Sequence, residues 1–336
     1  MVVRIGGVLF IGLSGVAMAE ETNTSQETKG ERPQISSFVH LPFPVKVPQR
    51  VLDLENKGDP IPYDRQLPIF GRELANRGYV LPKPFGASVF SVYNEQVNVI
   101  TDISVALGIG GPPPPDKPLV DLPFVTIGDT VSYTTNTQLK LDAWVLPFLN
   151  LFVGKGTLNG HADLTVRIDL DDFLPPPACN PANPCGTVDI PFSPSIDGQV
   201  YTVGGNFVYA SDPWFTGVNL SYSTTTNDDR TDISSVTAGL RAGRYWVVSE
   251  GLTITAYGGA TYMKSDEYVE GTAQAPGTLP NGQTLDVRYL IHQTNRDRWA
   301  AVAGLSFDVK RNVGIQIEGT YGRGTKRGMV SAYVRF

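Results

Sequence analysis

The sequence predicts an all-β fold: an antiparallel up-and-down β-barrel of about ten strands, with eight or twelve as alternative counts. Its 336 residues include 35 glycines, 14 tyrosines and 15 phenylalanines, which favours many strands joined by tight turns. Apolar and polar residues alternate with a period of two through much of the chain after residue 85. Short and long connections also alternate between these segments. Together, the three observations predict strands that run up and down through one closed sheet.

The alternation is clearest in the C-terminal third of the chain. Apolar residues occupy every second position from Trp299 to Val309, and the pattern resumes at Val313 after a tight turn. Similar segments precede this pair along the chain. The predicted strands lie at approximately 86–101, 130–145, 150–169, 199–210, 214–225, 233–245, 252–264, 299–310, 313–321 and 328–336.

The connections predict a barrel that crosses an outer membrane, because such barrels have short periplasmic turns and longer external loops. The long connections are 102–129, 170–198 and 265–290, with shorter ones at 226–232 and 323–327. A soluble β-sandwich is the alternative. However, the segment 150–169 would extend roughly 60 Å at about 3.3 Å per residue, much longer than a sandwich strand. The length of this strand therefore favours the membrane barrel.

The two faces of that long strand differ in polarity. We expect the glycine-rich apolar face, from Phe152 to Ile168, to contact lipid. The opposite face would then point into the lumen, with Lys155, Thr157, Asn159, His161, Asp163, Thr165, Arg167 and Asp169.

Composition and charge exclude several classes of protein. Hydrophobic residues make up 41% and charged residues 18% of the chain, which argues against wholesale disorder. No apolar run reaches the length of a transmembrane helix. The formal net charge of −6 provides no basic surface for nucleic acid, so we expect no such partner.

The N-terminus predicts export. Residues 1–19 contain Arg4, an apolar stretch and the sequence Ala17-Met18-Ala19, the pattern of a secretory signal that is cleaved before Glu20. No cysteine follows the cleavage site, so a lipid anchor is not supported. Residues 20–84 are polar and rich in proline, and they predict an irregular periplasmic extension with at most one short helix around 64–77. The barrel would occupy residues 85–336.

Two cysteines, Cys179 and Cys185, lie close together in the 170–198 connection. In an oxidising compartment they would most simply form a disulfide that staples a small loop. A zinc site is a poor competitor because it needs four ligands and no histidine is near in sequence. We therefore expect no metal and no other cofactor.

Residues 86–336 resemble the small outer-membrane β-barrels of Gram-negative bacteria, the porin-like and OmpA-like group. The resemblance rests on the signal peptide, the alternating strands and the C-terminal Val330-x-Ala332-x-Val334-x-Phe336. That ending is similar to the signal read by the barrel-assembly machinery, although the common form has an aromatic residue where this chain has Val334. The resemblance implies an outer-membrane location, partners in the assembly machinery and periplasmic chaperones, and contact with membrane lipid and lipopolysaccharide. It identifies no subfamily.

Polar side chains on the other face of the strands predict the lining of the lumen. Because ten strands enclose a narrow interior, these side chains favour a network of hydrogen-bonded ion pairs over a wide pore. We therefore expect a narrow passive channel or a structural membrane protein. The predicted set is Lys140, Asp142, Lys155, His161, Asp163, Arg167, Asp169, Arg241, Asp308, Lys310, Gln316, Glu318 and Arg335.

Two other functions remain open. The polyproline run at 112–115 and the loop predicted to be stapled suggest an adhesin or receptor that binds an extracellular ligand through loops 102–129 and 170–198. His161 and Asp163 would suit an outer-membrane hydrolase, but the chain has neither a G-x-S-x-G nor an HExxH motif. We therefore expect no enzyme.

Aromatic residues near strand ends predict interfacial anchors, namely Trp214, Tyr245, Trp246, Trp299 and Phe336. Trp144 is an exception, because its position along the strand places it on the inward face.

Overall fold

The computed structural model describes residues 43–46, 63–77, 79–121, 125–173, 184, 186–226, 232–249, 251–278, 283–309 and 312–336. All of them belong to one compact unit, Pro33–Phe336.

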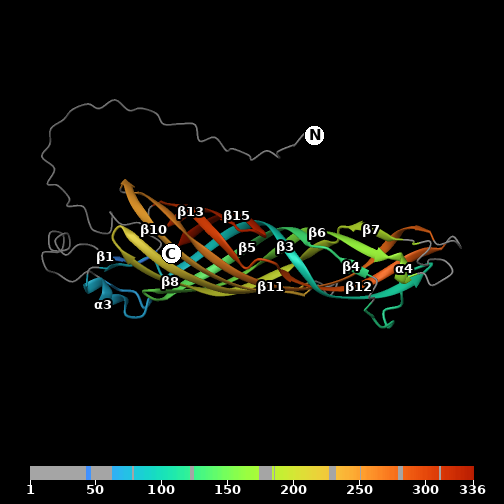
Figure 1. Ribbon diagram of the computed structural model, residues 1–336. Helices are drawn as coiled ribbons and strands as arrows, with labels where there is room; N and C mark the ends of the chain where they lie inside the picture. The colour runs from blue at the N-terminus through green and yellow to red at the C-terminus, as the bar shows by residue number, and fades with distance from the viewer. Residues whose placement is uncertain are drawn as a thin grey trace, which may run out of the picture. The chain divides into compact units, whose positions relative to one another are not determined.

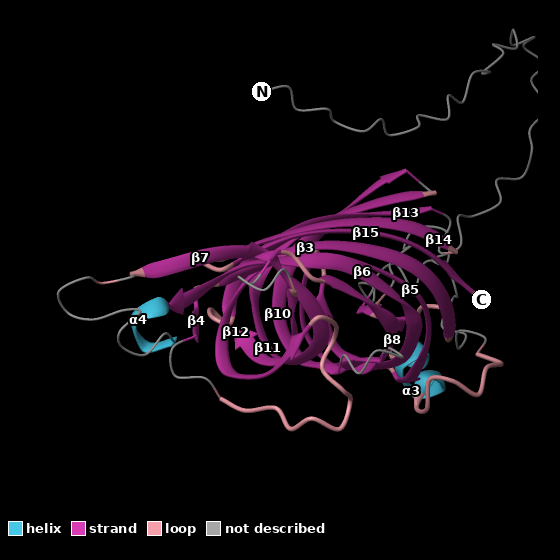
Figure 2. Cartoon of the chain, turned by 90° about the vertical axis from the view of Figure 1, so that its right-hand side faces the viewer, coloured by secondary structure: helices cyan, strands magenta, loops and turns pink. Residues whose placement is uncertain are grey.

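A closed antiparallel ring of about ten strands forms the body of this unit (Figures 1 and 2), which confirms the predicted fold class and strand count. The pairing of the first ring strand with the last closes the sheet, so the ring has no open edge. In ring order the strands are β3 (Phe85–Ile109), β5 (Thr130–Leu146), β6 (Leu149–Asp169), β8 (Ser195–Ser211), β9 (Trp214–Thr226), β10 (Asp232–Ser249), β11 (Leu252–Thr278), β13 (Trp299–Val309), β14 (Val313–Tyr321) and β15 (Thr325–Arg335).

The ring has a short-turn end and a long-loop end. Tight turns such as Pro147-Phe148 and Asp212-Pro213 join strands at the short-turn end. Helix α3 (Gly71–Asn76) and the C-terminus lie there, whereas β4 (Val125–Ile127), β7 (Thr187–Phe192), α4 (Leu170–Phe173) and β12 (Thr284–Asn295) lie at the opposite end (Figure 1).

The strands continue past the ring at the long-loop end. There β12 pairs with the extended parts of both β3 and β11, while β4 and β7 pair with the extended part of β6. The predicted loops 265–290 and 102–129 are therefore wrong in part, because both contain strand. Val287, Tyr289 and Ile291 fall on one face at alternate positions of β12, and this period of two is typical of a strand.

An apolar cluster packs between these extensions. Its buried members are Val105, Leu164, Val269, Tyr289 and Ile291, which come from β3, β6, β11 and β12. Burial raises the pKa of Tyr289 to about 12, so its hydroxyl stays neutral. The cluster holds the extended strands together above the ring.

The outer face of the ring carries an apolar belt bordered by aromatic side chains. Aliphatic residues such as Leu139, Val203 and Ile317 are about half exposed along this face. So much apolar surface is unusual for a protein surrounded by water, whereas an apolar band between two aromatic girdles is typical of a barrel in lipid. The exposed aromatic residues include Phe85, Phe148, Phe207, Tyr209, Trp214, Trp246 and Phe336 toward the short-turn end, and Tyr93, Tyr201, Tyr222, Trp299 and Tyr321 toward the other.

The segment before the ring contacts its short-turn end. Strand β1 (Val45–Lys46) pairs with β2 (Tyr79–Val80), and α3 falls within the range predicted for a short helix. The amide of Ile69 donates a hydrogen bond of 2.9 Å to the carbonyl of Val145 at the end of β5. Among the residues described, no helix has the length and apolar character to span a membrane.

Candidate functional site: the lumen cavity

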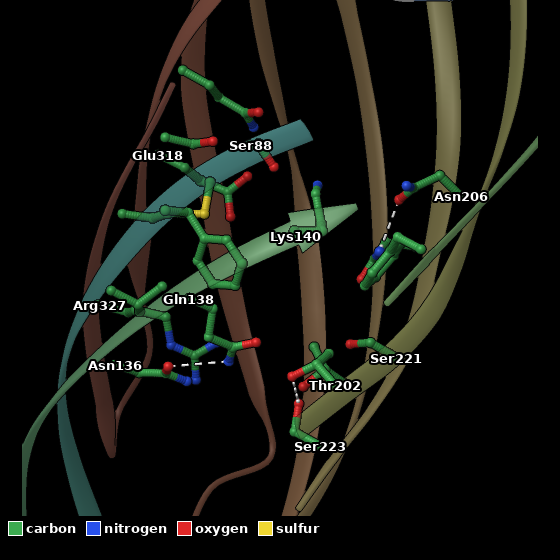
Figure 3. Close-up of a pocket in the computed structure, with 18 of the residues that line it drawn as sticks. Ser88, Asn136, Gln138, Lys140, Thr202, Asn206, Ser221, Ser223, Glu318 and Arg327 are labelled. Carbon is green, nitrogen blue, oxygen red and sulfur yellow. Dashed lines mark hydrogen bonds between the residues drawn. The ribbon is translucent and has the colours of Figure 1, made fainter. Parts of the chain in front are cut away.

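A cavity of about 530 Å³ lies inside the ring (Figure 3). We call it the lumen cavity. Inward-facing side chains from all ten ring strands line it, together with Phe43 from the preceding segment. The lining combines charged and amide groups with apolar side chains such as Phe90, Phe152 and Val200. This mixture suits a solute that has both polar and apolar parts.

The first charged cluster of the cavity is built around Glu318 on β14. Arg241 donates two hydrogen bonds to it, from Nε to Oε2 at 2.9 Å and from Nη2 to Oε1 at 2.8 Å. The hydroxyl of Tyr257 donates to Oε2 at 3.0 Å, and the amide of Gln316 donates to that hydroxyl at 2.6 Å. Both carboxylate oxygens of Glu318 are therefore occupied.

The second cluster joins Arg335 of β15 to side chains on four neighbouring strands. Arg335 Nη2 donates to Asp142 Oδ2 at 2.8 Å, and the two side chains are only 8% and 7% exposed. The amide of Asn150 donates to the same oxygen at 2.6 Å. The ladder continues from Asn206 to Asn150 at 3.1 Å and from Asn219 to Asn206 at 2.8 Å. It ties β5, β6, β8 and β9 together across the lumen wall.

Two further cations line the cavity. Arg327 donates to Asn94 Oδ1 at 3.3 Å and to Met263 Sδ at 2.9 Å. Lys140 Nζ lies 5.1 Å from the centre of the Phe152 ring. Within the described part of the chain, no carboxylate oxygen lies within 4.0 Å of either cation.

Several buried polar atoms of the lining lack a partner among the described residues. They are Ser88 Oγ, Gln138 Oε1, Trp144 Nε1 and Thr255 Oγ1. Ser88 lies directly across the strand pair from Lys140, and Gln138 and Trp144 share its face of β5. The cavity around Lys140 therefore offers hydrogen-bonding capacity that these protein groups do not use.

Phe43 fills the short-turn end of the lumen cavity. Its ring stacks on Phe215 with centroids 4.8 Å apart and meets Tyr245 edge-on at 6.2 Å. Buried Trp144 and Ala210 complete this group, which we call the Phe43 cluster. The expected interfacial position of Tyr245 is therefore wrong, because its inward-facing side chain is 5% exposed.

A polar group marks the other end of the cavity. The Glu267 carboxylate accepts hydrogen bonds from Gln293 Nε2 at 2.6 Å and from Asn98 Nδ2 at 3.2 Å. All three side chains are buried. The apolar cluster of the strand extensions includes Ile291, which lies two residues from Gln293 on β12.

The structure places seven residues of the predicted lumen set on the inward face. Lys140, Asp142, Arg241, Glu318 and Arg335 line the cavity, together with the predicted Gln316. Asp308 also points inward, where it is 3% exposed and accepts hydrogen bonds from Ser306 and Tyr333. These residues form the two clusters and their immediate surroundings. Lys310 lies outside the described residues.

The predicted faces of the long strand are wrong, because β6 is turned the other way. Lys155, His161, Asp163 and Arg167 are exposed on its outer face, whereas Phe152 and Leu158 are buried inside. Lys155 lies over the ring of exposed Tyr201 at 5.2 Å. Asp169 pairs through its backbone with Thr187 of β7 in the extension, beyond the lumen cavity.

The physical reason is that β6 extends beyond the apolar belt. Its outer face is apolar at Leu151 and Val153 and becomes polar where it leaves the belt. The glycines of the inner face make room for neighbouring side chains. The Gln138 side chain, for example, packs against Gly154 and Gly156.

The structure adds residues that the sequence analysis missed. Arg327 is one of them, because it lies in the predicted connection 323–327, whereas β15 begins at Thr325 and places Arg327 on the same face as Arg335. Phe43 had no signal in the sequence, because its contacts are with strands more than a hundred residues away. Glu267 and Asn98 lie in or beside segments that were expected to be irregular.

The C-terminal assembly motif lies on the outer face of β15. Val330, Ala332 and Val334 point outward, and Phe336 is 61% exposed. Phe336 and Phe85 exchange backbone hydrogen bonds of 3.0 and 3.1 Å, which join the chain end to the start of the ring. The recognition of this motif by the assembly machinery stays a prediction.

The predicted surface loops are described in part. Arg288 on β12 donates hydrogen bonds to the carbonyls of Pro114, Pro115 and Lys117, which holds the polyproline segment against the strand extensions. Cys179 and Cys185 lie outside the described residues. Ligand binding by these loops stays a prediction.

No known protein-family model and no curated protein sequence matches the chain. Among solved structures, the toluene transporter TbuX of Ralstonia pickettii is similar over 76% of this chain and 90% of its own, with 10% identity and a TM-score of 0.31. The β domain of the Bordetella autotransporter BrkA matches over 74% and 99%, with 11% identity and a TM-score of 0.31. The attachment protein Ail of Yersinia pestis matches over 74% and 96%, with 12% identity and a TM-score of 0.19. Likenesses this weak carry no function over to this chain.

Proposed function

We propose that this chain is an integral outer-membrane β-barrel of a Gram-negative bacterium and that its lumen is a narrow, gated passage for small solutes. The observation that carries the proposal is the lumen cavity of about 530 Å³, whose short-turn end is filled by the side chain of a separate segment, at Phe43. A gate that does not belong to the wall moves without unfolding the barrel.

The outer face supports the membrane part of the proposal. Its apolar belt and two aromatic girdles suit a bilayer core about 25 Å thick with an interface on each side. The short-turn end would face the periplasm, and the strand extensions would face outward. The proposal includes the cleaved signal at 1–19, assembly through the C-terminal motif with the help of periplasmic chaperones, and contact with membrane lipid and lipopolysaccharide.

Conductance of the refolded mature chain in planar bilayers tests the gate. We expect Phe43→Ala to raise the open probability by about tenfold or more, because it removes a buried ring from the packing that holds the segment in place. Phe148→Ala is the matched control, since that phenylalanine lies at the same end but is 49% exposed on a turn. It should behave like the unmodified protein.

The result that contradicts the proposal is equally direct. If neither Phe43→Ala nor a chain lacking residues 20–62 shows conductance steps, the lumen is not a passage. A structural role would then remain for the barrel.

A further inference from the structure

Two cations of the lumen cavity have no carboxylate within salt-bridge distance among the described residues. Among the described residues, the cavity is lined by Lys140, Arg241, Arg327 and Arg335 and by the carboxylates Asp142, Glu267 and Glu318. Arg241 and Arg335 each have a bonded carboxylate. Arg327 and Lys140 are the two cations left over.

Arg327 has no carboxylate partner among the described residues, because the nearby carboxylate of Glu318 already accepts hydrogen bonds from other side chains. Glu318 lies close to it on the neighbouring strand, but both Glu318 oxygens accept hydrogen bonds from Arg241 and one also accepts from Tyr257. Among the described residues, Arg327 has an amide oxygen and a thioether sulfur as its acceptors. A guanidinium with such weak partners has donors available for an anion.

Lys140 has unused donors beside it. Its ammonium faces the Phe152 ring, and the Ser88 hydroxyl lies directly across the strand pair. Neither this hydroxyl nor the indole N–H of Trp144, four residues further along the same face of β5, has an acceptor among the described residues. Figure 3 shows the Lys140 side chain projecting from β5 into the cavity, with Ser88 on the adjacent strand. An ammonium, a hydroxyl and an indole N–H together favour a ligand that accepts hydrogen bonds.

An apolar stretch separates the two cations. Ser88 lies opposite Lys140, and Asn94 accepts from Arg327, so the inward residues between them on β3 are Phe90 and Val92. Six residues of strand correspond to about 20 Å. A solute that moves along this wall meets a cation, then apolar side chains, then a second cation.

We propose that the lumen cavity takes small organic carboxylates with an apolar body, which bind Arg327 and Lys140 in turn while Phe90, Val92 and Phe152 contact the apolar part. This inference rests on the proposed function of the lumen as a passage and adds the class of solute. A cavity of about 530 Å³ is large enough for a single-ring carboxylate.

Equilibrium dialysis of labelled benzoate against the full mature chain in lipid nanodiscs tests the inference. Benzyl alcohol and benzylammonium are the neutral and cationic probes of similar size, and nanodiscs without protein give the background. Equilibrium dialysis is insensitive to how slowly a probe enters a gated lumen. We expect benzoate to bind at least about tenfold more tightly than either other probe, as charge-assisted hydrogen bonds predict.

The variants assign the binding to the two cations. Arg327→Met and Lys140→Met should each weaken benzoate binding by about tenfold and leave benzyl alcohol binding unchanged. Lys155→Met is the matched control, because Lys155 is a lysine on the outer face of the same barrel, and it should bind benzoate as the unmodified chain does. If either variant fails to fold, Arg327→Gln and Lys140→Gln replace it.

Two outcomes overturn the inference. One is equal binding of benzoate and benzyl alcohol, and the other is benzoate binding that neither cation variant weakens. The reversal potential of Phe43→Ala in a potassium chloride gradient separates this failure from failure of the proposed function. A conducting lumen without anion preference contradicts only the solute class, whereas absence of conductance contradicts the passage itself.

Discussion

Asp142→Ala lowers the free energy of unfolding by about 3 kcal/mol, since the change leaves the Arg335 guanidinium buried without its carboxylate. The Arg335 side chain is 8% exposed, and its other contacts are the Lys83 carbonyl at 3.1 Å and the Trp144 ring at 5.9 Å. Asn150 also loses the oxygen to which it donates. Urea unfolding of the protein in lipid vesicles, followed by tryptophan fluorescence, measures the loss.

Asp189→Ala is the control for this prediction. Asp189 makes an equally short bidentate pair with Arg167, at 2.7 and 2.9 Å, but both side chains are about half exposed on the strand extensions. Its hydrogen bonds with Arg167 lower the pKa of Asp189, yet solvent screens the pair and the unfolding midpoint should not move. Equal effects at Asp142 and Asp189 would contradict the burial of the lumen pair. The double variant Asp142→Leu/Arg335→Met should recover most of the lost stability.

Gly156→Ala destabilises the barrel by about 1–3 kcal/mol, because the inner face of β6 has no room for another methyl group. Gly156 lies directly opposite Gln138 of β5. A β-carbon at Gly156 would overlap the carbonyl oxygen of Thr137 and lie 2.7 Å from Gln138 Cγ. The same urea unfolding experiment detects the change.

Gly319→Ala provides the comparison, because nothing lies within 4 Å of a β-carbon at that outward-facing position of β14. We expect Gly319→Ala to leave the unfolding midpoint unchanged. If Gly156→Ala were as well tolerated as Gly319→Ala, the inward orientation of the β6 glycines would be wrong.

The barrel architecture was predictable because each strand shows its own alternation of apolar and polar residues. Alternation from Trp299 to Val309 and from Val313 to Tyr321 is local in sequence, and pairs of such strands leave little choice of topology. The inward side of Trp144 followed from the same alternation. The interfacial prediction for Tyr245 is wrong because an aromatic residue near a strand end does not by itself indicate the girdle, and Tyr245 shares the inward face with Arg241.

The direction of the β6 faces was harder to predict. In a strand that lies wholly in lipid, the more apolar face points outward. Most of β6 lies past Leu151 and Val153, where the outer face meets water and carries Lys155. On the crowded inner face, glycines occur because neighbouring side chains leave no room for larger residues. The outer face of β6 therefore changes from apolar to polar along the strand. The rule that the more apolar face points outward does not hold for the strand as a whole.

The candidate site depends on contacts between distant segments. Phe43 comes from a separate segment and meets Phe215 and Tyr245, which lie on the neighbouring strands β9 and β10, only in the tertiary fold. The spare charge of Arg327 likewise depends on Glu318 being bound by Arg241. Sequence alternation places these side chains on the inner face, but it does not say which of them bond to each other.

Fluorescence of single-tryptophan variants in vesicles of brominated lipid tests the central claim, a lipid-facing belt around a closed lumen. One variant keeps Trp299, which is 66% exposed on the outer face, and the other keeps Trp144, which is 3% exposed inside, with phenylalanine at the remaining tryptophans. We expect strong quenching of Trp299 by lipid brominated near the headgroup and no quenching of Trp144. Equal quenching of the two, or quenching of Trp144 alone, would contradict this claim.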